Sequence, residues 1–160
     1  MQIVVRPPLR SLLSLAALMS LLGFPARAES SVESEAAIRF ALETWTTAFN
    51  TGDTAKVCDL FARDLVASYQ GQPERGHEAI CALLMKSLTD TSRAYRYSLD
   101  LKEIIVSGDL AAVRLTWTLE IDPKNGGPKL VNVEPGLDIF RRQADGSWRI
   151  QRYLAYPANP

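Results

Sequence analysis

The feature that most constrains this chain is a long alternation of apolar and polar residues between Leu110 and Asp122. Side chains on a β-strand point to opposite faces with a period of two, so this alternation predicts a long strand with one buried and one wetter face. On this interpretation, the buried face carries Ala111, Val113, Leu115, Trp117, Leu119 and Ile121.

Further strands are predicted on both sides of this one. A short strand is predicted over residues 65–70, and Gly108-Asp109 is a tight turn signal into the central strand. Pro135-Gly136 interrupts a later run and predicts a β-bulge that bends that strand. The other three long strands of the expected meander cover residues 95–107, 130–143 and 148–156.

Helical patterns occupy the earlier half of the chain. Residues 34–49 repeat apolar side chains at spacings of three and four, with Ser31 or Ser34 available to cap the start and Gly52 to end the helix. A short second helix is predicted from Asp53 or Thr54 through Ala62, and a third over His77–Leu88. The expected fold is therefore α+β, with three N-terminal helices packed on a strongly bent antiparallel sheet to form a cone-shaped barrel.

The first 28 residues predict a signal peptide. Arg6 and Arg10 precede the short apolar run Ser11–Phe24, and Ala26-Arg27-Ala28 fits a small-x-small cleavage site. An uncleaved membrane anchor is the alternative, but the run is shorter than the roughly 20 residues that a spanning helix needs. We therefore expect one domain over residues 29–160 in a periplasmic or secreted protein, with no membrane contact after cleavage.

The charge balance and the cysteines narrow the possible partners. Cleavage removes three Arg and leaves 15 basic and 18 acidic residues with no basic stripe, so we expect no nucleic-acid binding. An even cysteine count in an exported chain predicts a disulfide between Cys58 and Cys81 that joins two helices, although two free buried thiols are the alternative. A lone His without clustered carboxylates predicts no metal site, and we expect no cofactor.

Five segments carry a resemblance to a known family. They are Trp45–Asp53, Leu60–Asp64, Gly76–Ile80, Gly136–Arg141 and Asp145–Ile150. Together they resemble the nuclear transport factor 2-like superfamily, in its SnoaL-like and ketosteroid-isomerase-like branch. The resemblance implies a conical pocket and a homodimer formed through the sheet. It leaves the activity open, because this fold hosts isomerases, cyclases, dehydratases and binding or assembly modules.

Asp138 is the leading candidate for chemistry. It lies in an apolar strand, where burial would raise its pKa, and it aligns with the protonated Asp that donates a hydrogen bond in ketosteroid isomerases. It could instead face solvent or pair with Arg114 or Arg152. The resemblance implies a catalytic base at Tyr69, or at Gln70 if the loop shifts. Neither side chain is a carboxylate, so we expect no strong catalysis.

His77, the only histidine, is a candidate acid or base at the pocket mouth, or simply a polar residue in the first turn of a helix. We expect the pocket to bind a small hydrophobic ligand, and the alternative is an isomerase, cyclase or dehydratase that uses Asp138 with Tyr69 or His77. The alternatives are that the predicted pocket residues fill the core, or that one sheet face pairs with a second copy. These pocket residues are Trp45, Tyr69, Tyr97, Trp117, Asp138, Gln151 and Tyr153.

Overall fold

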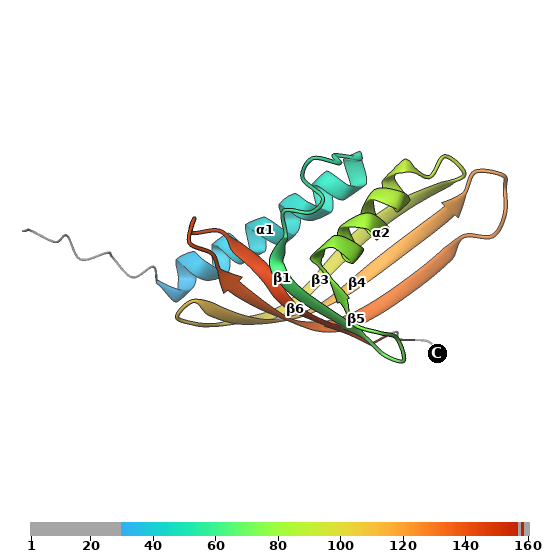
Figure 1. Cartoon of the computed structure of the whole chain (residues 1–160). Coiled ribbons are helices and arrows are strands. Elements are labelled where there is room, and N and C mark those ends of the chain that lie inside the picture. The colour runs from blue at the N-terminus through green and yellow to red at the C-terminus, as the bar shows by residue number, and fades with distance from the viewer. Residues whose placement is uncertain (1–29, 157, 159–160) are drawn as a thin grey trace, which may run out of the picture.

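The computed structural model describes residues 30–156 and 158, and in it two helices lie on the same face of a curved six-stranded sheet (Figure 1). The helices are α1 (Ser31–Thr51) and α2 (His77–Thr89). The strand order is β2-β1-β6-β5-β4-β3. The strands are β1 (Phe61–Tyr69), β2 (Arg75–Gly76), β3 (Arg93–Ser107), β4 (Leu110–Pro123), β5 (Leu130–Arg142) and β6 (Trp148–Ala155).

The α+β class is confirmed, but the prediction of three helices is wrong. Residues 54–60 form tight turns, with a single helix-like bond from the Val57 amide to the Asp53 carbonyl at 3.2 Å. The Val57 carbonyl, which such a helix would pair with the Phe61 amide, accepts instead from the Trp45 indole at 2.8 Å, and the neighbouring Leu60 carbonyl accepts from the Ile150 amide at 2.8 Å. Tertiary contacts therefore override a helical periodicity that still buries the expected apolar side chains.

α1 is longer at both ends than the sequence predicts. Ser30, rather than Ser31 or Ser34, caps it: its hydroxyl accepts from the Glu33 amide while the Glu33 carboxylate accepts from the Ser30 amide. The predicted stop at Gly52 is confirmed, because Gly52 adopts a left-handed conformation with φ of 75°. The buried stripe of α1 holds Ile38, Leu42, Trp45 and Phe49 against the sheet.

The alternation in β4 is confirmed over its first eight residues, where Ala111, Val113, Leu115 and Trp117 are buried. The bulge predicted at Pro135-Gly136 is wrong, because the β4–β5 register runs through it without a shift. The Pro135 carbonyl accepts from the Tyr156 amide at 3.0 Å just past the end of β6, so the missing N–H of the proline breaks no ladder bond.

The sheet is mixed rather than fully antiparallel, which corrects a second part of the fold prediction. β1 runs parallel to β6, whereas every other neighbouring pair is antiparallel. The observed irregularities lie in β1 between Phe61 and Val66, in β3 between Leu101 and Glu103, and in β6 at Gln151, opposite the Ile139–Phe140 step. These irregularities change which face the later residues occupy, and they help to curve the sheet around the helices.

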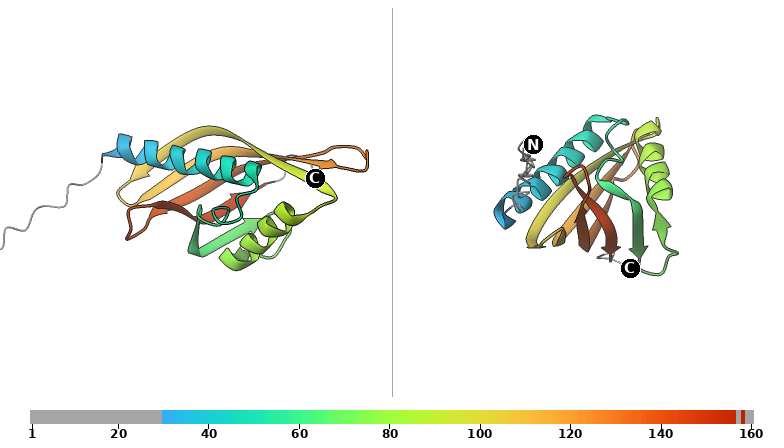
Figure 2. Two further views of the ribbon diagram at one scale, coloured as in Figure 1. Left: turned by 90° about the horizontal axis from the view of Figure 1, so that it is seen from above. Right: turned by 60° about the vertical axis from the view of Figure 1, so that its left-hand side comes forward.

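A disulfide joins Cys58 to Cys81, as predicted, but it connects the turn after α1 to α2 rather than two helices. Seen from above and from the side, α1 lies toward β3 and α2 toward β1 on the same face of the sheet (Figure 2). The predicted signal peptide lies outside the described residues. Among the helices that the structure describes, none combines the length and apolar character needed to cross a bilayer.

Candidate functional site

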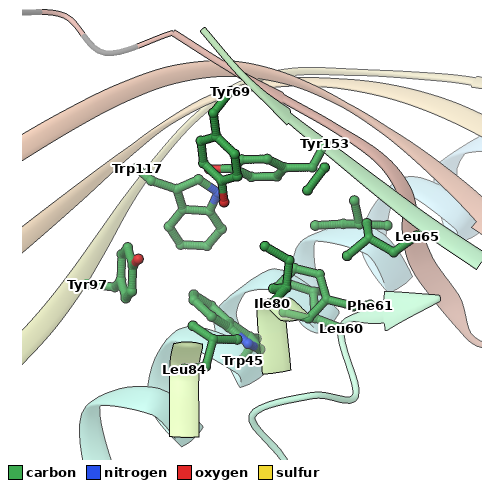
Figure 3. A pocket seen from close by; sticks show the side chains of 12 residues that line it. Trp45, Leu60, Phe61, Leu65, Tyr69, Ile80, Leu84, Tyr97, Trp117 and Tyr153 are labelled. Atoms are coloured by element: carbon green, nitrogen blue, oxygen red, sulfur yellow. The ribbon is translucent and has the colours of Figure 1, made fainter. Parts of the chain in front are cut away.

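A cavity of about 40 Å³ lies between α2 and the concave face of the sheet (Figure 3). α2 contributes Ile80 and Leu84, which are the two buried residues of that helix. Five of the seven residues predicted to bind ligand line the cavity: Trp45, Tyr69, Tyr97, Trp117 and Tyr153. The sequence therefore identifies most of the aromatic wall correctly as one spatial group.

One residue from each strand forms a continuous row across the sheet, which we call the aromatic belt. In strand order its members are Arg75, Tyr69, Tyr153, Glu134, Trp117 and Tyr97. Each member contacts or pairs with the next. The Arg75 guanidinium lies 5.3 Å from the centre of the Tyr69 ring, and the Tyr69 and Tyr153 rings are 5.4 Å apart.

The other half of the belt continues through a hydrogen bond and ring contacts. The Tyr153 hydroxyl donates to Glu134 Oε2 at 3.2 Å, Glu134 pairs with Trp117 in the β4–β5 register, and the Trp117 and Tyr97 rings are 5.8 Å apart. α1 supports this end with Trp45, whose ring lies 5.0 Å from that of Trp117. The belt therefore crosses all six strands of the sheet, and four of its members line the cavity.

The polar hydrogens of the cavity wall fall into two groups. The Trp45 indole N–H donates to the Val57 carbonyl at 2.8 Å, so it holds the turn after α1 and is not free for a ligand. By contrast, the Tyr69 hydroxyl, the Tyr97 hydroxyl and the Trp117 indole N–H have no hydrogen-bond partner within residues 30–156 and 158. The wall is thus mostly apolar, with three unpaired hydrogen-bond donors.

Asp138 points into the concave side of the sheet and is fully buried. It pairs with Val113 on one side and Tyr153 on the other, and neither carboxyl oxygen has a hydrogen-bond partner in the described part of the chain. Burial raises the pKa of Asp138 well above its usual value, with weak opposition from the backbone of Leu154. Asp138 does not line the cavity, since Tyr153 lies at the wall beside it.

Two predicted site residues lie away from the cavity. Gln151 occupies the β6 irregularity, and its amide donates to Asp64 Oδ2 at 2.6 Å. His77 begins α2 with its ring 3.7 Å from the Cys81 sulfur, and burial, followed by the Arg63 charge, lowers its pKa. The structure therefore brings neither Gln151 nor His77 to the group that includes Trp117 and Tyr153.

Glu134 is the site residue that the sequence interpretation missed. It lies four residues before Asp138 on the same face of β5, so a strand without a bulge places both carboxyl groups inside. The bulge predicted at Pro135-Gly136 would leave the phase of Glu134 undetermined, so the sequence analysis did not consider it. Simple alternation backward from Phe140 was the signal that could have found it.

Burial shifts the acids and phenols of the belt toward their neutral forms. Burial raises the pKa of Glu134, although its hydrogen bond from Tyr153 acts in the opposite direction. Burial and the nearby Glu134 charge raise the pKa of Tyr69 to about 12 and also raise the pKa of Tyr97 and Tyr153. The three tyrosines therefore keep their hydroxyl hydrogens at neutral pH. In the described chain, no three or more His, Cys, Asp or Glu side chains are grouped to hold a metal ion.

The fold matches several solved structures of the nuclear transport factor 2-like type. A conserved protein from Planctomyces limnophilus is 24% identical, with a TM-score of 0.71, and the match covers 78% of this chain and 96% of that one. A ketosteroid isomerase-like protein from Erwinia carotovora is 25% identical, with a TM-score of 0.64 and coverage of 80% and 98%.

A third similar structure contains a bound small molecule. This protein from Catenulispora acidiphila was solved in complex with S-DNPA and is 18% identical, with a TM-score of 0.65 and coverage of 80% and 96%. No protein of curated function matches this chain. The SnoaL-like domain matches residues 42–152, more than half of the sequence, and the chain belongs to this family.

Proposed function

We propose that this protein binds a small, largely apolar ligand between α2 and the aromatic belt. The observation that carries the proposal is the set of unpaired donors on Tyr69, Tyr97 and Trp117 in a wall that is otherwise apolar. Three accessible donors on one mostly apolar wall can orient a small ligand that offers an oxygen acceptor, which is the usual composition of a ligand site.

The size of the cavity limits how that ligand enters. At about 40 Å³ the space is far below the roughly 300–1,000 Å³ of typical ligand pockets, so a wall must move for an aromatic molecule to bind. α2 is the wall best suited to move, because only Ile80 and Leu84 are buried among its residues and Leu83 is 44% exposed. Its bond through Cys81 keeps the N-terminal half close to the turn at Cys58.

The proposal is tested by titrating the protein with phenol, indole, 1-naphthol and cyclohexanone and following tryptophan fluorescence and the melting temperature. We expect Trp117 to report binding of at least one compound, and Ala67→Val, which adds volume to the cavity wall, to weaken it. Trp148→Phe is the matched control, since Trp148 packs against Arg142 and lies outside the cavity. No response to any compound, or equal binding by Ala67→Val, contradicts the proposal.

The enzymatic alternative remains a second candidate because of Asp138. Burial raises the pKa of this carboxyl and so favours its neutral form, and a neutral acid can donate a hydrogen bond to a substrate oxygen. This use of Asp138 requires Tyr153 to move aside. Any isomerase, cyclase or dehydratase turnover that survives Asp138→Ala removes Asp138 from the mechanism.

We also propose that the protein is exported and forms a homodimer. The Cys58–Cys81 disulfide supports an oxidising compartment, and cell fractionation with mass measurement of the mature chain tests cleavage after Ala28. On the sheet face turned away from the helices, Ile105, Val131, Leu137 and Leu154 are exposed apolar residues that a second copy would cover. Sedimentation of Leu137→Arg should then show monomers, whereas the unchanged protein should form dimers.

A further inference from the structure

The contact between Tyr153 and Glu134 has a consequence for ligand choice. Tyr153 lines the cavity, and its hydroxyl lies 3.2 Å from Glu134 Oε2. In the β5–β6 register Tyr153 pairs with Asp138, yet its hydroxyl reaches Glu134 four residues earlier on β5. Its side chain therefore crosses diagonally from its register partner Asp138 toward Glu134. This crossing places one phenol oxygen between the cavity and a carboxyl group.

A phenol carries a single hydrogen, and Glu134 controls where that hydrogen points. While Glu134 is a carboxylate it can only accept, so the Tyr153 hydrogen points to Glu134 and the phenol oxygen presents a lone pair to the cavity. When Glu134 is protonated, its own hydrogen can be donated to the phenol oxygen, and the Tyr153 hydrogen is released toward the cavity. The two states of one carboxyl group thus convert Tyr153 from an acceptor into a donor.

We propose that Glu134 is a positioning residue that selects, through Tyr153, which hydrogen-bonding group of a ligand the cavity recognises. An ionised Glu134 favours a ligand hydroxyl, as in a phenol or enol, and a protonated Glu134 favours a ligand that offers only an oxygen acceptor, such as an ether or ketone. This inference rests on the proposed binding function. It adds a ligand class, small hydroxyaromatic compounds at neutral pH, and a residue that determines specificity.

The other groups around Glu134 leave it as the main titrating member of the belt. Tyr69 on β1 and Tyr97 on β3 stay protonated, since their pKa values are raised. Arg75 on β2 contacts the Tyr69 ring. Asp138 is the other titratable acid on this side of β5, and burial also raises its pKa, so the experiment must separate it from Glu134.

The decisive experiment compares phenol with anisole, in which a methyl group replaces the hydroxyl hydrogen. Calorimetry or tryptophan fluorescence gives the dissociation constants at about pH 4.5 and pH 8, where phenol stays neutral. We expect the preference for phenol over anisole to be roughly five-fold larger at the higher pH, the effect of one hydrogen bond. Glu134→Gln should make the preference independent of pH, and Tyr153→Phe should remove it at both values.

Two matched controls isolate Glu134. Asp138→Asn should keep the pH dependence, and Glu103→Gln, which changes a half-exposed carboxyl on the outer face of the sheet, should behave like the unchanged protein. Circular dichroism confirms that each variant is folded at both pH values. Two results overturn this inference and leave the binding proposal intact. In the first, both probes bind but the preference for phenol over anisole does not change with pH. In the second, the preference changes with pH equally in Glu134→Gln. Failure of both probes to bind overturns this inference, whereas the binding proposal fails only when its wider compound panel also gives no response.

Discussion

The two helices cover the same face of the sheet but pack against it in different ways. α1 buries a continuous stripe, in which Ile38 and Leu42 have no exposed surface and Trp45 and Phe49 have almost none. α2 buries Ile80 and Leu84, and the cavity lies between them and the belt. α1 therefore completes the hydrophobic core, whereas α2 covers the cavity.

If the proposed binding function holds, this difference separates the helix that stabilises the fold from the helix that admits the ligand. Close packing under α1 leaves little freedom for movement, because dense cores transmit any change in volume to their neighbours. The weaker contacts under α2 make it the element that can open at low free-energy cost. The unpaired donors, the buried Asp138 carboxyl and the half-buried Glu134 carboxyl belong to the sheet, so opening α2 would expose the proposed binding surface without changing its geometry.

The largest expected effect is the cost of shortening the core of α1. Leu42→Ala should lower the free energy of unfolding by about 2–5 kcal/mol, because Leu42 is fully buried and its removal leaves a cavity. Leu84→Ala on α2 should cost at or below about 2 kcal/mol, since Leu84 already borders empty space. Urea unfolding monitored by circular dichroism measures both. Equal losses would show that the two helices contribute equally to the core.

The disulfide is the next test, since it holds α2 near the turn that follows α1. Replacing both cysteines by Ser should lower the free energy of unfolding by about 3 kcal/mol, the chain-entropy value for a closed loop of this length. We expect ligand association to become faster in this variant, because the tether on the movable helix is gone. Stopped-flow fluorescence measures that rate, and an unchanged rate would argue against α2 as the moving wall.

The buried acids on the α2 side make stability depend on pH. The pKa of Asp138 is higher in the folded than in the unfolded protein, so the folded state binds more protons between the two values. Stability should therefore fall as pH rises from the unfolded pKa through the folded one, by up to about 1.4 kcal/mol per pH unit. Asp138→Asn should flatten this dependence in urea unfolding between pH 4 and pH 8. A dependence that stays as steep in the variant would assign the pH effect to Glu134 or another group.

Local patterns predicted the elements whose side chains alternate without interruption. The phase of β4 and the stop at Gly52 follow from strand alternation and from glycine conformation, which need no knowledge of distant contacts. The absent second helix depends on hydrogen bonds from Trp45 and Ile150, residues 12 and 90 positions away from their acceptors in the chain. The parallel placement of β1 beside β6 is likewise a long-range choice that no local pattern encodes.

The aromatic lining of the cavity was predicted from the sequence as one spatial group, whereas Glu134 was not among the predicted residues. Tyr69, Tyr97 and Trp117 are large and alternate with polar neighbours, so their common destination could be inferred. In the sequence, Glu134 looks like a solvated charge unless it is known which β5 residues face inward. A bulge at Pro135, which the structure does not show, would exchange the inward and outward faces of the strand. A single register error therefore hides a buried carboxyl while leaving the apolar wall recognisable.

The smallest expected effect concerns the starts of the two helices. Ser30 caps α1 with a side-chain hydrogen bond, whereas Gly76 at the start of α2 has none. Gly76 has an extended backbone, and a Cβ there would lie 3.8 Å from the Leu65 carbonyl oxygen, an ordinary contact. Gly76→Ser should therefore stabilise the protein by a few tenths of a kcal/mol, because its hydroxyl can accept from an amide in the first turn. Urea unfolding measures the gain in stability. Slower ligand association in this variant would show that a more stable α2 opens less often. A gain in stability with an unchanged association rate would place the opening elsewhere than at the start of α2.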